Sequence, residues 1–179
     1  MGVEADVEHL AGVLPLAAII PFPDLLFGGA LLVAVVLLHG LGIRLVATHF
    51  YRRITIIAHR SHASVRLDVL LGICIFLLLA LHLTEIVLWT AALVYSKLVG
   101  DWRVAAFFAA NTYTTLGYGN FVLPPEWTMM APIIAISGLF AFGWTGSVLV
   151  GFVAAVNKIR DAAKGASHAA TPPTDAQSG

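Results

Sequence analysis

The part of this chain best suited to chemistry is a short polar segment, Thr112 to Asn120, within an otherwise apolar sequence. A cation that has lost its water needs oxygen ligands, and backbone carbonyls can supply them where successive oxygens point toward one axis. Gly117 and Gly119 reach the backbone angles that this requires without steric cost. The Thr115 hydroxyl can add a further oxygen. These residue types therefore favour coordination of a desolvated cation.

The segment resembles the signature of the potassium-channel pore family, Thr-x-x-Thr-x-Gly-Tyr-Gly. The matching residues are Thr112, Thr115, Gly117, Tyr118 and Gly119. The resemblance covers roughly Val69 to Asn157. It implies a selectivity filter lined by Thr115, Leu116, Gly117, Tyr118 and Gly119, with K⁺ bound at the first four of these as the permeant ion. It also implies that Thr112, Thr114, Asn111 and Asn120 support the filter.

Three residues depart from the family pattern. Leu116 stands where the family usually has valine, Asn120 where it usually has aspartate, and Asn111 where many members have an acid. A pair of carboxyl groups behind the filter is therefore absent. The two amides could hydrogen-bond to one another or to the backbone. We expect altered inactivation or altered filter stability from this change.

The composition indicates that the solvent of this chain is a bilayer. Of 179 residues, 59% are hydrophobic and 11% are charged, whereas soluble domains carry about 25% charged residues. Three apolar runs reach the length of about 20 residues that a spanning helix needs, at roughly Leu25 to Ala47, Val69 to Ser96 and Trp127 to Val156. The formal net charge of zero argues against nucleic acid as a partner.

The link between the second and third runs is too apolar for a simple loop. Gly100 can end the preceding helix, and Asp101 can cap a new one. Trp102 to Thr114 is then a helix too short to cross a bilayer. An apolar half-helix of this kind fits a re-entrant segment that neighbouring helices bury. The predicted fold class is an all-α membrane protein with three transmembrane helices, a re-entrant pore half-helix and a filter loop.

Basic residues orient the three helices, because they favour the cytoplasmic side. They gather in the link between the first two runs and in the tail: Arg44, Arg52, Arg53, Arg60, Arg66, Lys158, Arg160 and Lys164. The prediction is a multi-pass protein of a bacterial inner membrane, with its N-terminus outside and its C-terminus in the cytoplasm. The basic link is a candidate contact for anionic lipids.

Four segments follow from these boundaries. Residues 1–23 are predicted to be an extracellular or periplasmic segment, and residues 24–67 an accessory transmembrane helix with the basic link. Residues 68–157 are the predicted pore module, and residues 158–179 a disordered cytoplasmic tail. One pore loop per chain implies that four chains close the ring, so we expect a homotetramer.

The third run contains candidates for gating. A bend at Gly138 or Gly143 would resemble the family's hinge, although close helix packing explains a glycine equally well. Phe140, Val148 and Phe152 are candidates for a hydrophobic gate, or else packing residues.

His82 and Glu85 lie three residues apart on the second run and so share a helix face. Ionisable groups inside a membrane usually face the bundle interior or water. One interpretation is a structural hydrogen bond to the pore helix, at Asn111 or Tyr113. Sensing of pH and ion binding are the alternatives.

The favoured function is passive conduction of K⁺ through a tetrameric pore, with no cofactor. A nonselective cation channel and a nonconducting membrane interaction protein that retains the pore fold are the alternatives. An enzyme is not expected, because the outer link has no nucleophile beside a base.

Overall fold

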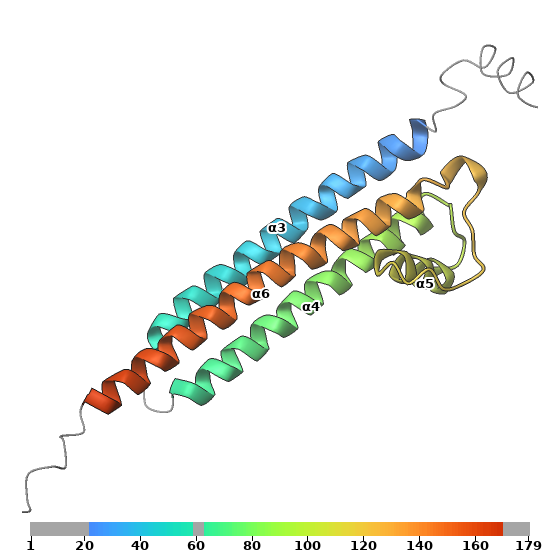
Figure 1. The fold of residues 1–179 in the computed structure, drawn as a ribbon. Coiled ribbons are helices and arrows are strands. Elements are labelled where there is room, and N and C mark those ends of the chain that lie inside the picture. Colours follow the sequence, from blue (N-terminus) through green and yellow to red (C-terminus); the bar gives the residue numbers. More distant parts are fainter. Residues whose placement is uncertain (1–21, 59–62, 170–179) are drawn as a thin grey trace, which may run out of the picture. The chain divides into compact units, whose positions relative to one another are not determined.

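The computed structural model describes residues 22–58 and 63–169, and these residues form helices joined by short loops (Figure 1). The elements are α3 (Phe22–Ala58), α4 (Ala63–Tyr95), α5 (Trp102–Tyr113), the 3-10 turn η1 (Pro125–Trp127) and α6 (Met130–Ala169). No strand occurs in these two ranges. The predicted all-α fold is confirmed. Helices α3, α4 and α6 are each long and apolar enough to cross a membrane.

Helix α3 is longer than its apolar run predicted. It continues past Ala47 to Ala58, so Arg52 and Arg53 lie on a helix and not in a link. The reason is packing: Phe50 and Ile54, one turn apart, are both buried, and burial of one face stabilises a helix beyond its intrinsic propensity. Arg60 of the predicted basic link lies outside the described residues.

The tail prediction is wrong for residues 158–169, which continue α6 as far as Ala169. Alanine, the strongest helix former, recurs in this stretch. An ion pair in which Arg160 donates to Asp68 of α4 also ties it down. Residues 170–179, and the first 21 residues of the predicted N-terminal segment, lie outside the described ranges.

Helix α4 ends earlier than predicted, and not at Gly100. Lys97 takes the left-handed conformation that ends the helix, with φ of 61°. The Leu98 N–H then donates to the Leu93 carbonyl at 3.0 Å, and the Lys97 N–H to the Val94 carbonyl at 2.9 Å. These two bonds form a Schellman motif, which satisfies carbonyls left free by the helix end.

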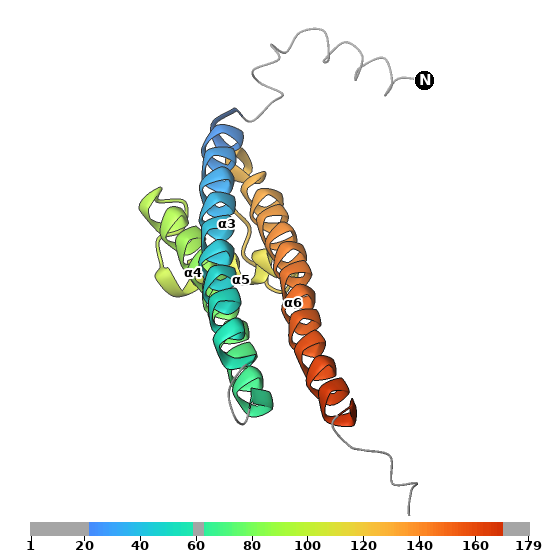
Figure 2. The same cartoon turned by 90° about the vertical axis from the view of Figure 1, so that its left-hand side faces the viewer.

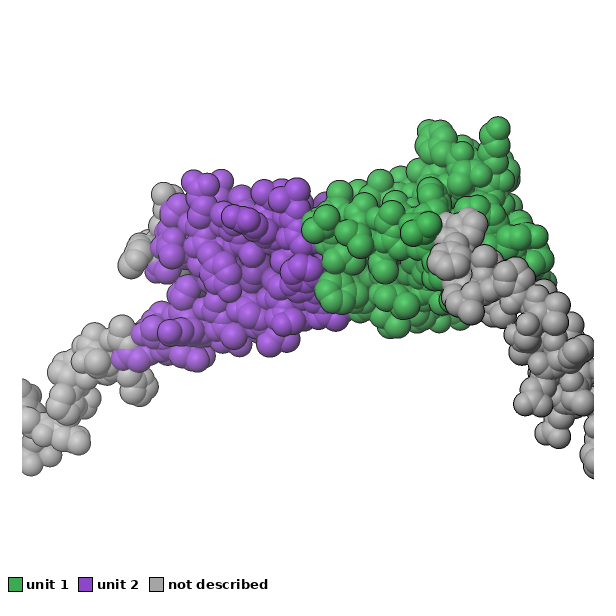
Figure 3. Space-filling model, turned by 90° about the horizontal axis from the view of Figure 1, so that it is seen from above, with its two compact units in different colours: residues 1–38, 83–141 green, residues 39–82, 142–179 purple. Residues whose placement is uncertain are grey.

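The chain divides into two compact units, coloured separately in Figure 3. Unit 1 comprises residues 1–38 and 83–141, and unit 2 comprises residues 39–82 and 142–179. Each of α3, α4 and α6 contributes one part to each unit.

The core of unit 2 is aliphatic and aromatic. Its three helical segments run side by side in both views (Figures 1 and 2). Phe50 of α3 stacks on Phe152 of α6 with ring centroids 4.1 Å apart. Cys74 of α4 is buried in the same cluster with a free thiol, as its position in an apolar run predicted.

Candidate functional site

The polar segment is positioned by α5, which lies in unit 1. The predicted N-cap is present: one carboxylate oxygen of Asp101 accepts hydrogen bonds from the backbone N–H groups of Arg103, at 2.8 Å, and Val104, at 3.0 Å. These bonds satisfy donors of the first turn that have no partner inside the helix. The helix ends at Tyr113, directly before the segment.

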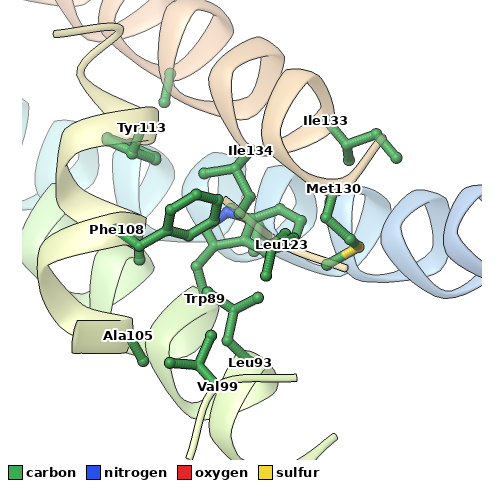
Figure 4. Close-up of a cluster of buried hydrophobic side chains, with 13 residues drawn as sticks. Trp89, Leu93, Val99, Ala105, Phe108, Tyr113, Leu123, Met130, Ile133 and Ile134 are labelled. Carbon is green, nitrogen blue, oxygen red and sulfur yellow. The ribbon is translucent and has the colours of Figure 1, made fainter. Parts of the chain in front are cut away.

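One face of α5 is buried in the core of unit 1. Its buried residues, Ala105, Phe108, Ala109 and Tyr113, follow helical spacing. In Figure 4 the Trp89 indole of α4 lies between Phe108 of α5 and Ile134 of α6. The Trp89 indole N–H donates to the Ser137 hydroxyl of α6 at 3.0 Å. The core of this unit therefore joins α5 to both neighbouring long helices.

The sign of the backbone dihedral φ alternates along the polar segment. Thr115, Gly117 and Gly119 have φ of 57°, 67° and 132°, while Thr114 has φ of −83°, and Leu116 and Tyr118 have negative φ as well. Alternation of right- and left-handed residues turns successive peptide planes so that N–H groups gather on one side and carbonyls on the other. Glycine takes positive φ freely, whereas Thr115 is β-branched and is strained there.

Asn111 of α5 accepts two hydrogen bonds from the backbone of the polar segment. Its side-chain carbonyl oxygen accepts a hydrogen bond from the Tyr118 backbone N–H at 2.7 Å. Its backbone carbonyl accepts from the Leu116 N–H at 2.9 Å. The amide thus bonds to the backbone, which is one of the two partners that the sequence left open. Thr114, another predicted support, bonds back to the Ala110 carbonyl of α5 at 2.8 Å.

The outer part of the segment is braced by aromatic rings. A Cβ built on Gly119 would lie 3.1 Å from the Phe107 ring, and Phe108 packs edge-to-face on Phe121 with centroids 5.6 Å apart. A pocket of about 370 Å³ opens here, and Thr112, Thr115 and Gly117 are among its lining residues.

The segment is exposed in the single chain. All residues from 114 to 122 are exposed, including Leu116 at 69%, Tyr118 at 73% and Val122 at 76%. Asn120 is exposed as well. Strained backbone and exposed apolar side chains occur here together.

Residues 81–155 match a family described as "Ion channel". We call these residues the channel module after that match. The match begins in α4 and ends in α6, so it contains α5 and the whole polar segment and leaves α3 outside. No curated protein and no solved structure matched the chain. The predicted ion-channel class and the extra N-terminal helix are thereby confirmed.

Glu85 connects two elements of the channel module. It is fully buried on α4, and the Tyr113 hydroxyl of α5 donates to its carboxylate at 2.5 Å. The predicted structural hydrogen bond to Tyr113 is therefore present. Burial first, and then this hydrogen bond, raise the pKa of Tyr113 well above its usual range, so the hydroxyl stays a donor.

His82 lies in unit 2, in an aromatic cluster. It stacks on Phe142 with centroids 4.4 Å apart, and its ring lies 5.3 Å from that of His39 on α3. His39 is buried, and its Nε2 lies 3.3 Å from the Thr145 hydroxyl of α6. The sequence singled out His82 but not His39, because nothing in the apolar run of α3 shows which residue its histidine meets.

Gly138 is a packing glycine of the channel module. A Cβ placed on it would lie 1.9 Å from the Tyr113 carbonyl oxygen. The last turn of α5 therefore lies directly against α6 at this point. A Cβ on Gly143 would meet nothing within 4 Å, and a hinge at Gly138 or Gly143 stays a prediction.

The three gate candidates have different surroundings. Phe152 is buried and stacked on Phe50 inside unit 2, so its side chain packs within this chain, and a gate there stays a prediction. Val148 is half-buried against the same core. Phe140 is half-exposed, at 50%, and stays a gate candidate.

The sequence did not indicate a contact between α3 and the channel module. Asp24 is fully buried, and its carboxylate accepts a hydrogen bond from the Met129 N–H at 3.0 Å, directly before α6. A carboxylate suits the positive end of a helix. Gly28, one turn later, lies against Met130 and Ile133 of α6.

Proposed function

We propose that four copies of this chain surround one pore and conduct K⁺ selectively across a membrane, with residues 115–119 of each copy lining the filter. The observation that carries the proposal is the alternation of φ along these residues. It occurs at the positions that resemble the potassium-channel signature. A chance Gly-Tyr-Gly turn would not need a β-branched residue at positive φ before it.

The alternation gives the filter its chemistry. Carbonyls that fall on one side of a strand can replace the water of K⁺, ring by ring, when several strands face one axis. The Thr115 hydroxyl adds a ring of oxygens at the inner end. Helix α5 ends directly before these oxygens, so the negative end of its dipole favours a cation there.

The proposed self-association is supported by the incomplete ion site and the exposed apolar side chains of a single chain. A single strand offers carbonyls from one side only, and it exposes Leu116, Tyr118 and Val122. Exposed apolar groups of this kind mark interaction surfaces. Closed cyclic symmetry is the usual solution for identical subunits, and four strands close a ring around K⁺.

The proposed placement is a plasma membrane, with the loops of unit 1 outside and the basic ends of α3 and α6 in the cytoplasm. Support comes from the distribution of basic residues, of which α5 and its flanking loops contain only Lys97 and Arg103.

The test is a reversal potential. The purified protein is reconstituted in liposomes under opposed K⁺ and Na⁺ gradients. The control is the variant Gly117→Ala, which would place an alanine at a backbone φ of 67°. We expect a reversal near the K⁺ equilibrium potential in the native chain and loss of that selectivity in the variant. Currents that do not distinguish K⁺ from Na⁺ would support a nonselective channel instead.

If the reconstituted protein gives no current, a second measurement distinguishes a closed channel from a protein without a K⁺ site. Binding of K⁺ and of Na⁺ to the detergent-solubilised protein is compared by isothermal titration calorimetry. Selective K⁺ binding that Gly117→Ala removes would indicate a closed channel with an intact filter. Absence of selective binding would contradict the proposal.

A further inference from the structure

The cytoplasmic half of α3 bears a basic surface outside the channel module. A hollow of about 620 Å³ is lined there by the side chains of Arg44, His49, Arg52 and Arg53, together with Leu41 and Leu45. The basic residues among them are exposed. All of these residues belong to unit 2.

A second hollow continues this surface onto α4, within the same unit. Its volume is about 380 Å³, and His49, Arg53 and Arg66 line it beside the apolar side chains of Val69 and Ile73. His49 and Arg53 line both hollows. The two form one surface with basic and apolar parts, which we call the basic groove.

The stretch of sequence that forms most of the basic groove contains no acid. No Asp or Glu occurs in the sequence between Asp24 and Asp68. Asp68, the first acid after the groove, already pairs with Arg160 of α6. An anionic partner is therefore the complement of this surface.

The length of α3 puts the groove at a membrane interface. Residues 25–43 carry no Asp, Glu, Lys or Arg. The twenty residue-to-residue steps from Asp24 to Arg44 rise about 30 Å along a helix, which is about the thickness of the hydrocarbon layer. Asp24 at one boundary thus puts Arg44 at the other, where phosphate headgroups lie.

We propose that the basic groove binds an anionic phospholipid. The guanidinium groups of Arg53 and Arg66 hold the headgroup phosphate, since arginine matches phosphate oxygens with paired donors. His49 lies in the part of the groove that both hollows share. The acyl chains lie on the apolar side chains beside it, at Leu41 and Leu45 on α3 and at Val69 and Ile73 on α4.

A lipid fits better than an acidic peptide. Each hollow combines basic side chains with exposed aliphatic ones, on helices long and apolar enough to span. A soluble acidic ligand would leave the aliphatic part uncovered, whereas a phospholipid carries complementary chemistry for both parts in one molecule.

The experiment is native mass spectrometry of the full chain in detergent, with equal amounts of palmitoyl-oleoyl phosphatidylglycerol and phosphatidylcholine. We expect the native chain to retain phosphatidylglycerol preferentially. The double variant Arg53→Gln with Arg66→Gln should reduce that preference about thirtyfold, because each basic side chain near an anionic surface contributes about fivefold. The matched control, Lys97→Gln with Arg103→Gln, removes the same charge from unit 1 and should keep the preference.

Two further arms complete the test. Arg53→Lys with Arg66→Lys keeps the charge and loses the paired donors, so its preference should fall between those of the native chain and the glutamine variant. Glycerophosphoglycerol, the headgroup without acyl chains, should not displace the lipid. An unchanged preference in both groove variants would overturn the proposal, and so would equal loss in the Lys97 and Arg103 control. Displacement by the free headgroup would also overturn it, in favour of a soluble phosphate ligand.

Discussion

At the scale of single residues, Asn111 shows how an amide can support this type of loop without a carboxyl group. Its side chain accepts from the Tyr118 N–H, and its own carbonyl accepts from the Leu116 N–H. Both bonds end on residues of negative φ, each of which lies between two residues of positive φ. A single residue of α5 thereby fixes the backbone at two points of the proposed filter.

Replacement of Asn111 by alanine should speed the decay of K⁺ current several-fold. The Tyr118 N–H would lose its acceptor, and a hydrogen bond of this kind contributes about 1 kcal/mol, or roughly a fivefold change in an equilibrium. The measurement is the decay time of macroscopic current. Asn157→Ala is the control, because Asn157 is an exposed asparagine on α6, outside the polar segment. Equal decay times in the native chain and Asn111→Ala would show that the bond does not hold the conducting state.

Tyr113→Phe should lower the free energy of unfolding by about 1–3 kcal/mol, because the buried Glu85 carboxylate loses a donor. Tyr95→Phe is matched to it in chemistry and is 78% exposed, so it should change little. Thermal unfolding in detergent measures both.

The effect of pH on this pair follows from the direction of the shift. Because the pKa of Tyr113 is raised in the folded chain, its hydroxyl contributes its full stabilisation at every pH below the unfolded pKa of about 10. The contribution declines progressively as the pH rises above that value toward the raised pKa of the folded chain. The difference between Tyr113→Phe and the native chain should thus be constant from about pH 6 to pH 9. A difference that vanished within that range would contradict the assignment.

At the scale of elements, apolar length and capping chemistry made the helices predictable. Asp101 and the run after it gave the bounds of α5, because a cap is a local interaction between neighbours in sequence. The far ends of α3 and α6 were not predictable in this way. They depend on Phe50, Ile54 and Arg160 meeting partners on other helices.

In the candidate site, too, local features were predictable from the sequence and long-range contacts were not. The proposed filter residues could be named from the sequence because their types and spacing determine which backbone conformations they can take. The sequence did not predict the contact of Gly138 with the Tyr113 carbonyl or the hydrogen bond from the Met129 N–H to Asp24. Residues far apart in sequence form both, and no local pattern encodes either. Glycine at the end of α4 was expected for the left-handed position, yet Lys97 occupies it.

The packing of α5 on α6 gives a test of the hinge prediction. Gly138→Ala should prevent assembly or destabilise the fold by about 1–3 kcal/mol or more, the usual cost of overpacking. The reason is that the added methyl group would overlap the backbone carbonyl of Tyr113. Gly143→Ala has space and should fold with equal or slightly higher stability, since alanine favours a helix. Thermal unfolding and elution volume compare them.

The outcome for Gly143→Ala separates two roles. A variant that folds but shows altered open probability would support a hinge at this position. A variant that folds and conducts as the native chain does would leave Gly143 as a simple helix residue. Stable folding of Gly138→Ala would contradict the close contact itself.

At the scale of the whole molecule, the polar segment is exposed in the single chain. All residues from 114 to 122 are exposed, and the side chains of Leu116 and Val122 are among the most open. Helix α3, outside the channel module, is tied to it by Asp24 and Gly28. The extra helix is therefore part of the same folded body within unit 1.

Potassium should stabilise the assembled protein. A ligand that binds only the assembled state raises its stability by mass action. In K⁺ the complex should unfold several degrees higher than in Na⁺ at the same ionic strength, with a mass four times the 19.0 kDa of one chain. Light scattering gives the mass. Gly117→Ala should lose the difference between the two ions, and equal unfolding temperatures for the native chain in both would contradict selective binding.

The contact at Gly138 also limits how this protein can evolve. Since any side chain there would overlap the Tyr113 carbonyl oxygen, the position is closed to substitution for as long as α5 keeps its place. A lineage that replaced this glycine would have to move α5 in the same step, or shortly after. Descendants of this chain that keep α5 packed on α6 should therefore retain glycine here even where the rest of α6 has diverged.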